Sequence, residues 1–362
     1  MKALIAMSGG VDSSVAACLM KEQGFSCIGV TMKLFQNEDI GVSREHTCCS
    51  LEDVEDARSV AHQLGIPYYV FNFSQRFRTC VMDQFVRAYE NGMTPNPCID
   101  CNRHLKFDAL FHRAKELGCD SVVTGHYARI ESDAISGRYL LKKAFDPAKD
   151  QSYVLYTMTQ EQLKHTRFPL GTLTKPEVRS IADRHGFLNA QKHDSQDICF
   201  VSSGTYTDFI QRYTAKEYPK GPFVDRDGKL LGTHNGIIHY TIGQRRGLNV
   251  SAGVPLYVCA IHPADNRIVL GPERELYSDT LIAKNINMIS VPFLDEPKRF
   301  KAKVRYRHPE QWATVTQLDS DTLKITFDVP QRAITPGQSV VLYDADVVVG
   351  GGTIQSTCSA SI

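Results

Sequence analysis

The feature that most constrains the fold is the run Ser-Gly-Gly-Val-Asp-Ser-Ser at residues 8–14. It lies between an apolar run at residues 3–7 and a segment with helical periodicity that begins near Val15. A strand, a glycine turn and a helix N-terminus in this order form an anion site, because the free N–H groups of the first helical turn point at a closely approaching ligand. The run therefore predicts a phosphate-binding loop.

The side chains of the run suit a nucleotide that is bound with magnesium. The hydroxyls of Ser8, Ser13 and Ser14 can donate to phosphate oxygens, and the Asp12 carboxylate can bridge to them through Mg²⁺. No Gly-Lys-Ser/Thr follows the glycines and no G-x-G-x-x-G is present, so the run is neither a Walker loop nor a dinucleotide fingerprint. The alternative is an ordinary serine-capped helix after a glycine turn.

Strand and helix patterns alternate over residues 1–130. Apolar runs predict strands at 28–32, 67–73 and 121–124, and helical spacing predicts helices at 51–64, 77–89 and 105–117. This alternation is typical of a doubly wound parallel sheet, in which ligands bind at the carboxyl ends of the strands. The glycine loop, Met32 and Gly125-His126 all fall at such ends.

Composition limits the remaining classes. The 362 residues carry a formal net charge of +1, so any nucleic-acid surface must be a local patch. No apolar run approaches the ~20 residues of a membrane span, and Met1 leads directly into the first strand without a signal peptide. Eleven cysteines without a signal indicate reduced thiols in a cytoplasmic protein.

The pattern changes after about residue 205. A helix is expected at 206–213, Asp227-Gly228 predicts a hairpin, and a basic loop follows at 243–248. From about Leu281 short alternating segments at 300–306, 312–318, 323–327 and 339–349 predict a small closed or sandwich β-domain. We expect an α/β domain at 1–204, a small central α+β domain at 205–274 and a C-terminal β-barrel at 275–362.

Two cysteines differ from the rest. Cys98 and Cys101 form a C-x-x-C in a polar segment that Pro95 and Pro97 are expected to keep irregular. A single C-x-x-C is a weak zinc signal, so nucleophilic or redox thiols are the better interpretation. Packing in the core is the default for the cysteines within apolar patterns, which are Cys18, Cys27, Cys80, Cys119 and Cys259. The role of Cys48-Cys49 stays open.

Motifs along the whole chain carry a family resemblance. They are the loop at 8–14, Thr-Pro-Asn-Pro at 94–97 with Cys101-Asn102 and Lys106-Phe107, Thr-Gly-His-Tyr at 124–127, Lys-Asp-Gln-Ser-Tyr at 149–153, Asp194-Ser195 with Ile-Cys-Phe at 198–200, Thr-Ile-Gly-Gln-Arg at 241–245, and Thr-Pro-Gly-Gln-Ser at 335–339. The set resembles the tRNA-specific 2-thiouridylases, which belong to the PP-loop ATP pyrophosphatases. The resemblance implies an enzyme that uses ATP and Mg²⁺, is a monomer when free, and acts on the anticodon arms of the lysine, glutamate and glutamine tRNAs.

The resemblance also implies the site residues. The ATP site would comprise Ala6, Met7, Ser8, Gly9, Gly10, Val11, Asp12, Ser13, Met32 and Gly125. The tRNA contacts would be Asn96, Pro97, Cys98, His126, Lys149, Asp150, Gln151, Arg305, Tyr306 and Gln338. Asp12, Cys101 and Cys199 would be the catalytic residues.

The implied reaction replaces the 2-oxygen of the wobble uridine at position 34 with sulfur. ATP would adenylate that oxygen, which makes it a leaving group, and pyrophosphate and AMP would be released. The base has to be flipped out of its stack to be reached. Cys199 would receive sulfur as a persulfide from a donor protein, a persulfide relay or a cysteine desulfurase, and Cys101 would assist transfer and end in a Cys101–Cys199 disulfide.

One position departs from the family pattern. Many members have an aspartate where this chain has Cys98, and that aspartate is a proposed general acid/base. Cys98, Cys101 and Cys199 could instead hold three irons of a [4Fe–4S] cluster whose fourth iron binds sulfide. Asp100 could alternatively replace the missing carboxylate. The sequence leaves these alternatives open.

Two rival functions remain. A PP-loop ligase for a small metabolite would use the C-x-x-C as a metal clip and would not require tRNA. A tRNA-binding scaffold with an inactive nucleotide loop would not need the intact loop and the two candidate catalytic cysteines that this chain has.

Overall fold

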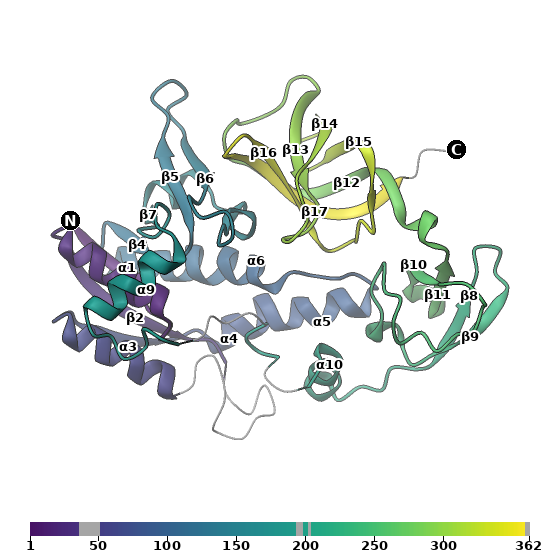
Figure 1. Ribbon diagram of the computed structural model, residues 1–362, viewed down its shortest axis with the longest axis horizontal. Coiled ribbons are helices and arrows are strands. Elements are labelled where there is room, and N and C mark those ends of the chain that lie inside the picture. Colours follow the sequence, from purple (N-terminus) through teal and green to yellow (C-terminus); the bar gives the residue numbers. More distant parts are fainter. Residues whose placement is uncertain (36–50, 193–197, 202–203, 359–362) are drawn as a thin grey trace. The chain divides into compact units, whose positions relative to one another are not determined.

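A computed structural model describes residues 1–35, 51–192, 198–201 and 204–358 (Figure 1). It divides into two compact units. Unit 1 comprises Met1–Met82, Pro97–Phe209 and Asp346–Val348, and unit 2 comprises Asp83–Asn96, Ile210–Ala345 and Val349–Ile362. Within the described ranges, no helix has the length and apolar character needed to cross a membrane.

Unit 1 is built on a parallel five-stranded sheet in the order β3-β2-β1-β4-β7. The strands are β1 (Lys2–Ala6), β2 (Ser26–Lys33), β3 (Tyr68–Asn72), β4 (Ser121–Val123) and β7 (Thr166–Arg167). The chain order reverses between β1 and β4, which is the topological switch point where such sheets bind ligands. The predicted doubly wound parallel sheet is confirmed.

Helices cover both faces of this sheet. Unit 1 contains α1 (Val11–Glu22), α3 (Leu51–Gln63), α4 (Ser74–Phe77), α6 (Pro97–Cys101), α7 (Leu110–Glu116), α8 (Gln160–Lys164) and α9 (Lys175–Arg184). Apolar side chains of α1, α3 and α9 pack with Ala3 and Ile5. Side chains of α7 pack with Leu4 in a second cluster. Successive β1 residues point to opposite faces, so the strand is buried on both sides.

Two longer helical runs contain π-helical turns. Residues 78–82 (Arg78–Met82) connect α4 to α5 (Asp83–Glu90), and Asn102–Ala109 connects α6 to α7. The helix predicted at 105–117 therefore starts earlier, at Pro97. The prediction of an irregular segment around the C-x-x-C was wrong, because proline is tolerated in the first turn of a helix, where its missing N–H has no partner to lose.

A hairpin of β5 (Ala128–Ser132) and β6 (Tyr139–Lys143) follows β4 and extends beyond the parallel sheet (Figure 1). The sequence patterns did not predict it. Lys142 of β6 pairs with Val347. The carboxylate of Asp346 accepts a hydrogen bond from Arg129 at 2.6 Å and contacts the Lys142 ammonium at 3.2 Å.

Unit 2 contains a small sheet and a closed barrel. The sheet order β10-β11-β8-β9 joins β8 (Gly221–Val224), β9 (Leu230–His234), β10 (Tyr257–His262) and β11 (Arg267–Gly271). The antiparallel β8–β9 pair turns at residues 225–229, which confirms the hairpin predicted at Asp227-Gly228. The helix predicted at 206–213 is α10 (Tyr206–Thr214).

The barrel has six strands, and pairing of β12 with β17 closes it. The strands are β12 (Tyr277–Met288), β13 (Lys298–Lys303), β14 (Gln311–Gln317), β15 (Leu323–Arg332), β16 (Ser339–Asp344) and β17 (Val347–Cys358). The segment predicted as one strand at 339–349 is two strands, because Ala345 turns the chain with a φ of 51°. The predicted C-terminal β-barrel is confirmed.

Candidate active site

The glycine run lies between β1 and the start of α1, as predicted. Gly9 has a φ of +78°, and a Cβ there would lie 2.4 Å from the Asp53 carbonyl oxygen, so the position requires glycine. The Ser13 hydroxyl accepts from the Ser8 N–H at 3.1 Å and donates to the Gly10 carbonyl at 2.9 Å. The Ser14 hydroxyl donates to the same carbonyl at 3.2 Å. In this conformation the loop uses these two hydroxyls to hold its own shape, and their donation to phosphate stays a prediction.

Asp12 is held by two side chains from distant elements. Lys175, the first residue of α9, donates to both Asp12 carboxylate oxygens at 2.7 and 2.8 Å, and the Tyr127 hydroxyl donates to Oδ1 at 2.8 Å. Lys175 is only 8% exposed. A lysine therefore reaches the glycine loop from another helix, although none follows the glycines in the sequence.

Two further residues fix the loop. Asn189, 3% exposed, donates through its amide to the Gly9 carbonyl and the Ser14 hydroxyl, both at 2.9 Å. A Cβ on Gly125, after β4, would lie 2.8 Å from backbone atoms of Asp12 and Ser13. Gly125 thus stands directly against the N-terminus of α1, as expected for a residue at the switch point. Met32 is half-buried near the carboxyl end of β2.

His126 is buried and neutral. Its Nδ1 lies 2.7 Å from the Thr124 hydroxyl and its Nε2 lies 3.4 Å from the Lys106 ammonium. Burial, with a smaller contribution from Lys106, holds the pKa of His126 well below its usual range. A neutral ring that accepts from lysine at Nε2 carries its proton on Nδ1 and donates it to Thr124. The rings of Phe107 and Phe168 pack against it.

The C-x-x-C lies on α6. Cys101 is buried, and this burial raises the pKa of its thiol to about 11 against the lowering effect of Lys106. Cys98 keeps an exposed surface, yet desolvation by the surrounding protein also raises its pKa. Desolvation raises the pKa of Asp100 to about 6. Lys106 is therefore the cation that favours thiolate formation at both cysteines.

Cys199 is half-buried and is a reduced cysteine, as are Cys98 and Cys101. The next residue, Phe200, packs its ring against Phe77 and Phe209 at centroid distances of 5.7 and 5.0 Å, which anchors this segment. Asp194-Ser195 and Cys48-Cys49 lie outside the described residues.

Residues 149–151, which are expected to contact tRNA, form a turn in the structure. The Asp150 carboxylate accepts from the Ala144 N–H at 2.9 Å and from the Ser152 hydroxyl at 2.8 Å. Gln151 exchanges two hydrogen bonds of 2.9 Å with the backbone of Tyr127, the residue that donates to Asp12. The turn therefore supports the glycine loop indirectly.

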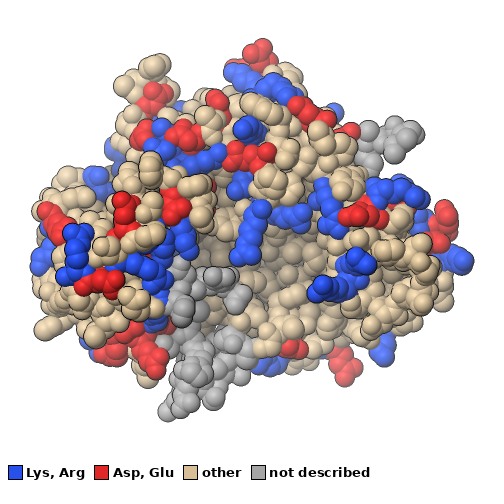
Figure 2. All heavy atoms as spheres, viewed as in Figure 1, with Lys and Arg blue, Asp and Glu red and all other residues tan. Residues whose placement is uncertain are grey.

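The predicted contacts in unit 2 lie on the barrel and on the segment before α6. The Gln338 amide donates to the carbonyls of Thr94 and Pro95 at 2.8 and 3.3 Å. Arg305 is half-buried and Tyr306 is 36% exposed. On the face in view in Figure 2, Lys and Arg are interspersed with Asp and Glu, in agreement with a net charge of +1.

Comparisons with known proteins cover nearly the whole chain. Family models described as the tRNA methyl transferase HUP domain, its PRC-barrel domain and an aminomethyltransferase β-barrel domain match residues 1–203, 207–272 and 278–354. The "tRNA-specific 2-thiouridylase MnmA" of Clostridioides difficile is 52% identical over 98% of both chains. The protein of the same name from Acetivibrio thermocellus is 51% identical over 98% of this chain and 99% of its own. The family models carry the words tRNA methyl transferase, whereas the full-length relatives are named as 2-thiouridylases. Identity of about half over the full length assigns the chain to the family of those relatives. The chain belongs to the tRNA-specific 2-thiouridylase family.

Proposed function

We propose that the protein is an ATP-dependent tRNA 2-thiouridylase, a transferase that converts the wobble uridine at position 34 of the lysine, glutamate and glutamine tRNAs to 2-thiouridine. The observation that carries the proposal is the glycine loop at the switch point of the sheet, with Asp12 held by Lys175 and Tyr127. Full-length identity of about half to proteins of that name supports it. The three matched models support domains with the proposed bounds 1–204, 205–274 and 275–362.

ATP would bind with its phosphates at the loop of residues 8–13 and at Gly125, with Ala6 and Met32 beside it at the strand ends. N–H groups at the start of α1 and the Lys175 ammonium would face the phosphates. Magnesium takes oxygen ligands, and the Asp12 carboxylate, 31% exposed, is an oxygen donor of the right type. When bound, the ion would neutralise phosphate charge.

In the first step the uridine 2-oxygen attacks the α-phosphorus of ATP, and pyrophosphate leaves. The adenylated oxygen is then a good leaving group. In the second step sulfur from the Cys199 persulfide attacks C2, the C2–O bond breaks and AMP departs. The Cys101 thiolate attacks the sulfur of Cys199, which frees the thiouridine and leaves a Cys101–Cys199 disulfide for later reduction.

The pKa of about 11 at Cys101 has a consequence for this scheme. In the free protein the Cys101 thiol is protonated at neutral pH, and a thiol is a poor nucleophile. Its activation requires a nearby base or a change in surroundings when tRNA binds. A neighbouring cation would lower that pKa, and Lys106 already acts in this direction.

The alternative sulfur carrier is a [4Fe–4S] cluster on Cys98, Cys101 and Cys199. The donor set fits in type, because all three are reduced cysteines and Cys98 and Cys101 lie one turn apart on α6. When bound, the cluster would supply an iron that holds sulfide. In either scheme a separate donor protein supplies the sulfur, and residues 96–98, His126, Lys149–Gln151, Arg305, Tyr306 and Gln338 are the proposed tRNA contacts.

Single cysteine variants distinguish the two schemes. We would purify the protein without oxygen, measure iron and sulfide, and assay thiolation of unmodified tRNA with Cys98→Ser, Cys101→Ser and Cys199→Ser. Cys259→Ser, at another half-buried reduced cysteine, is the matched control and should keep full activity. An iron-free protein in which Cys98→Ser is active and the other two are inactive establishes the persulfide. About four irons per chain, lost together with activity in Cys98→Ser, establish the cluster. Full activity of Cys199→Ser would contradict both schemes.

A further inference from the structure

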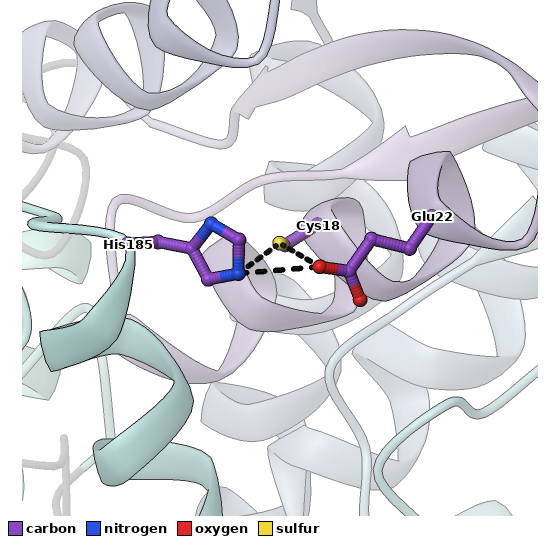
Figure 3. Close-up of side chains that lie close together, drawn as sticks. All are labelled: Cys18, Glu22 and His185. Atoms are coloured by element: carbon purple, nitrogen blue, oxygen red, sulfur yellow. Dashed lines mark hydrogen bonds and ion pairs between the residues drawn. The ribbon is translucent and has the colours of Figure 1, made fainter.

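A cluster of three ligand-type side chains lies at the end of α1 farthest from the glycine loop (Figure 3). Cys18 and Glu22 are one helical turn apart on α1, so their side chains share a face. His185, the residue after α9, points its Nε2 toward both. Among the described residues this is the one set of three Cys, His or carboxylate ligand atoms that lie within 4.8 Å of one another.

The distances within the cluster match those around a tetrahedral zinc ion. Cys18 Sγ lies 3.4 Å from His185 Nε2 and 3.8 Å from the Glu22 Oε1, and Nε2 and Oε1 are 3.2 Å apart. With usual zinc bond lengths, tetrahedral ligand atoms lie about 3.6 Å (S to N), about 3.5 Å (S to O) and about 3.3 Å (N to O) apart. Each observed edge is within about 0.3 Å of the ideal one.

The surroundings suit entry of a metal ion. Cys18 is 1% exposed, whereas the side chains of His185 and Glu22 are 37% and 54% exposed, so one side of the cluster faces solvent. The His185 ring stacks on Phe187 at a centroid distance of 5.6 Å, which fixes its orientation. The charged groups that act on Cys18 are Glu22, Lys21 and Arg184.

Without a metal ion the buried thiol stays protonated. Burial, and next the charge of Glu22, raise the pKa of Cys18 to about 11. A divalent ion replaces the thiol proton, which passes to solvent, and neutralises the charge that burial disfavours.

We propose that Cys18, Glu22 and His185 bind one Zn²⁺ ion through Sγ, a carboxylate oxygen and Nε2, with water at the fourth position. The mixture of thiolate, imidazole and carboxylate favours zinc over magnesium or calcium, which take oxygen ligands. The site is separate from Cys98, Cys101 and Cys199 and does not depend on the proposed function.

The ion would also tie two helices together. Lys175 at the start of α9 pairs with Asp12 at the start of α1, and the zinc site would join the end of α1 to the residue after α9. With α1 and α9 joined at both ends, α9 would keep Lys175 in position to pair with Asp12. The site thereby supports the geometry of the glycine loop from the opposite end of α1.

Cobalt is the probe for this site, because tetrahedral Co²⁺ with a thiolate ligand gives intense visible and near-ultraviolet bands. The full-length chain would be stripped with a chelator under reducing conditions and titrated with Co²⁺ and then with Zn²⁺. Cys98→Ser and Cys101→Ser are introduced together as the background, so that the C-x-x-C adds no thiolate signal. His185→Gln, Cys18→Ala and Glu22→Gln are compared with Cys27→Ala, a matched control at a buried cysteine on β2.

The proposal expects one equivalent of Co²⁺ with tetrahedral, thiolate-type bands that zinc displaces. His185→Gln, a change at a partly exposed side chain that should leave the fold intact, should raise the zinc Kd at least about 100-fold. Cys27→Ala should bind as the background does. Octahedral bands only, or a tetrahedral signal that persists at full strength in His185→Gln, would overturn the proposal and leave the cluster as a hydrogen-bonded group.

Discussion

At the scale of single residues, the site depends on buried charges whose surroundings decide their protonation. Lys175 is nearly fully buried and is compensated by Asp12, whereas His126 is buried next to Lys106 and is neutral. Cys101 and Asp100 on α6 both have raised pKa values because they are desolvated. A buried ionisable group without a full set of charge or hydrogen-bond partners lowers the stability of the fold. A functional site keeps such a group because its chemistry needs it.

Asp100→Asn tests this cost. The pKa of Asp100 is raised from 3.8 to about 6, so the folded state favours the protonated carboxyl. The stability that goes with the protonated form is fully present below pH ~4 and is lost as the pH rises through about 6, where the buried carboxylate becomes a penalty. The neutral asparagine removes that penalty and should increase the free energy of unfolding by on the order of 1–3 kcal/mol at pH 8 and by about half as much at pH 5.

The measurement is urea unfolding of Asp100→Asn and the parent chain at the two pH values. Asp227→Asn, at the exposed β8–β9 turn, is the control and should change neither value. A free energy gain of the same size at pH 5 and pH 8 would show that ionisation of Asp100 is not the cause.

Residues that belong to a local motif could be predicted from the sequence. Residues that reach the glycine loop only through the tertiary fold could not. The glycines, Asp12 and Gly125 stand at strand ends, so their place at the switch point followed from the alternation of strands and helices. Lys175 and Asn189 bind the loop from more than 160 residues away, and no local pattern links either to it. Pro176 in the first turn of α9 is a local signal for the helix that carries Lys175, but it gives no sign of the contact with Asp12.

At the scale of elements, α1 is the helix on which the site is organised. Its N-terminus meets the loop after β4 so closely that Gly125 has no room for a side chain, and α9 runs beside it from Lys175 to His185. The positions of β1, β2 and β4 were predictable because these strands are largely buried apolar runs, whereas the two-residue strand β7 was not predicted. The π-helical turns and the β5–β6 hairpin were not, because tertiary contacts decide them rather than spacing.

Gly125→Ala tests the close approach. The added methyl would meet the backbone of Asp12 and Ser13 at 2.8 Å, so the loop after β4 or α1 must shift. We expect the free energy of unfolding to fall by about 2–4 kcal/mol. We also expect the variant to lose ATP binding, because the shift displaces the glycine loop. Gly10→Ala is the matched control for stability, since its Cβ would meet only the Ser8 hydroxyl at an ordinary 3.5 Å. Equal stability losses in the two variants, measured by urea unfolding, would contradict this account.

At the scale of the whole molecule, a net charge of +1 means that RNA affinity depends on local basic groups. Arg245 and Arg246 are exposed in the loop between Tyr240 and β10. Arg299, by contrast, is paired with Asp328, which already neutralises it. Arginines without such a neutralising partner are better suited to replace counterions on phosphates.

The salt dependence of tRNA binding measures this difference. Replacing Arg245 and Arg246 together with alanine should reduce the slope of log K against log salt by about 1.5–2, the value for two phosphate contacts. Arg299→Ala should leave the slope unchanged. An unchanged slope in the double variant would place the phosphate contacts elsewhere.

The most direct test of the central claim is to count AMP and 2-thiouridine in one reaction that contains unmodified tRNA, ATP, Mg²⁺ and a persulfide or sulfide donor. The account predicts equal amounts of the two products, formed only when tRNA and ATP are both present, and a loss of both by at least about 100-fold in Asp12→Ala, since the loop supplies the activation of the uridine oxygen. AMP formed without tRNA, or 2-thiouridine formed at an undiminished rate by Asp12→Ala, would contradict it.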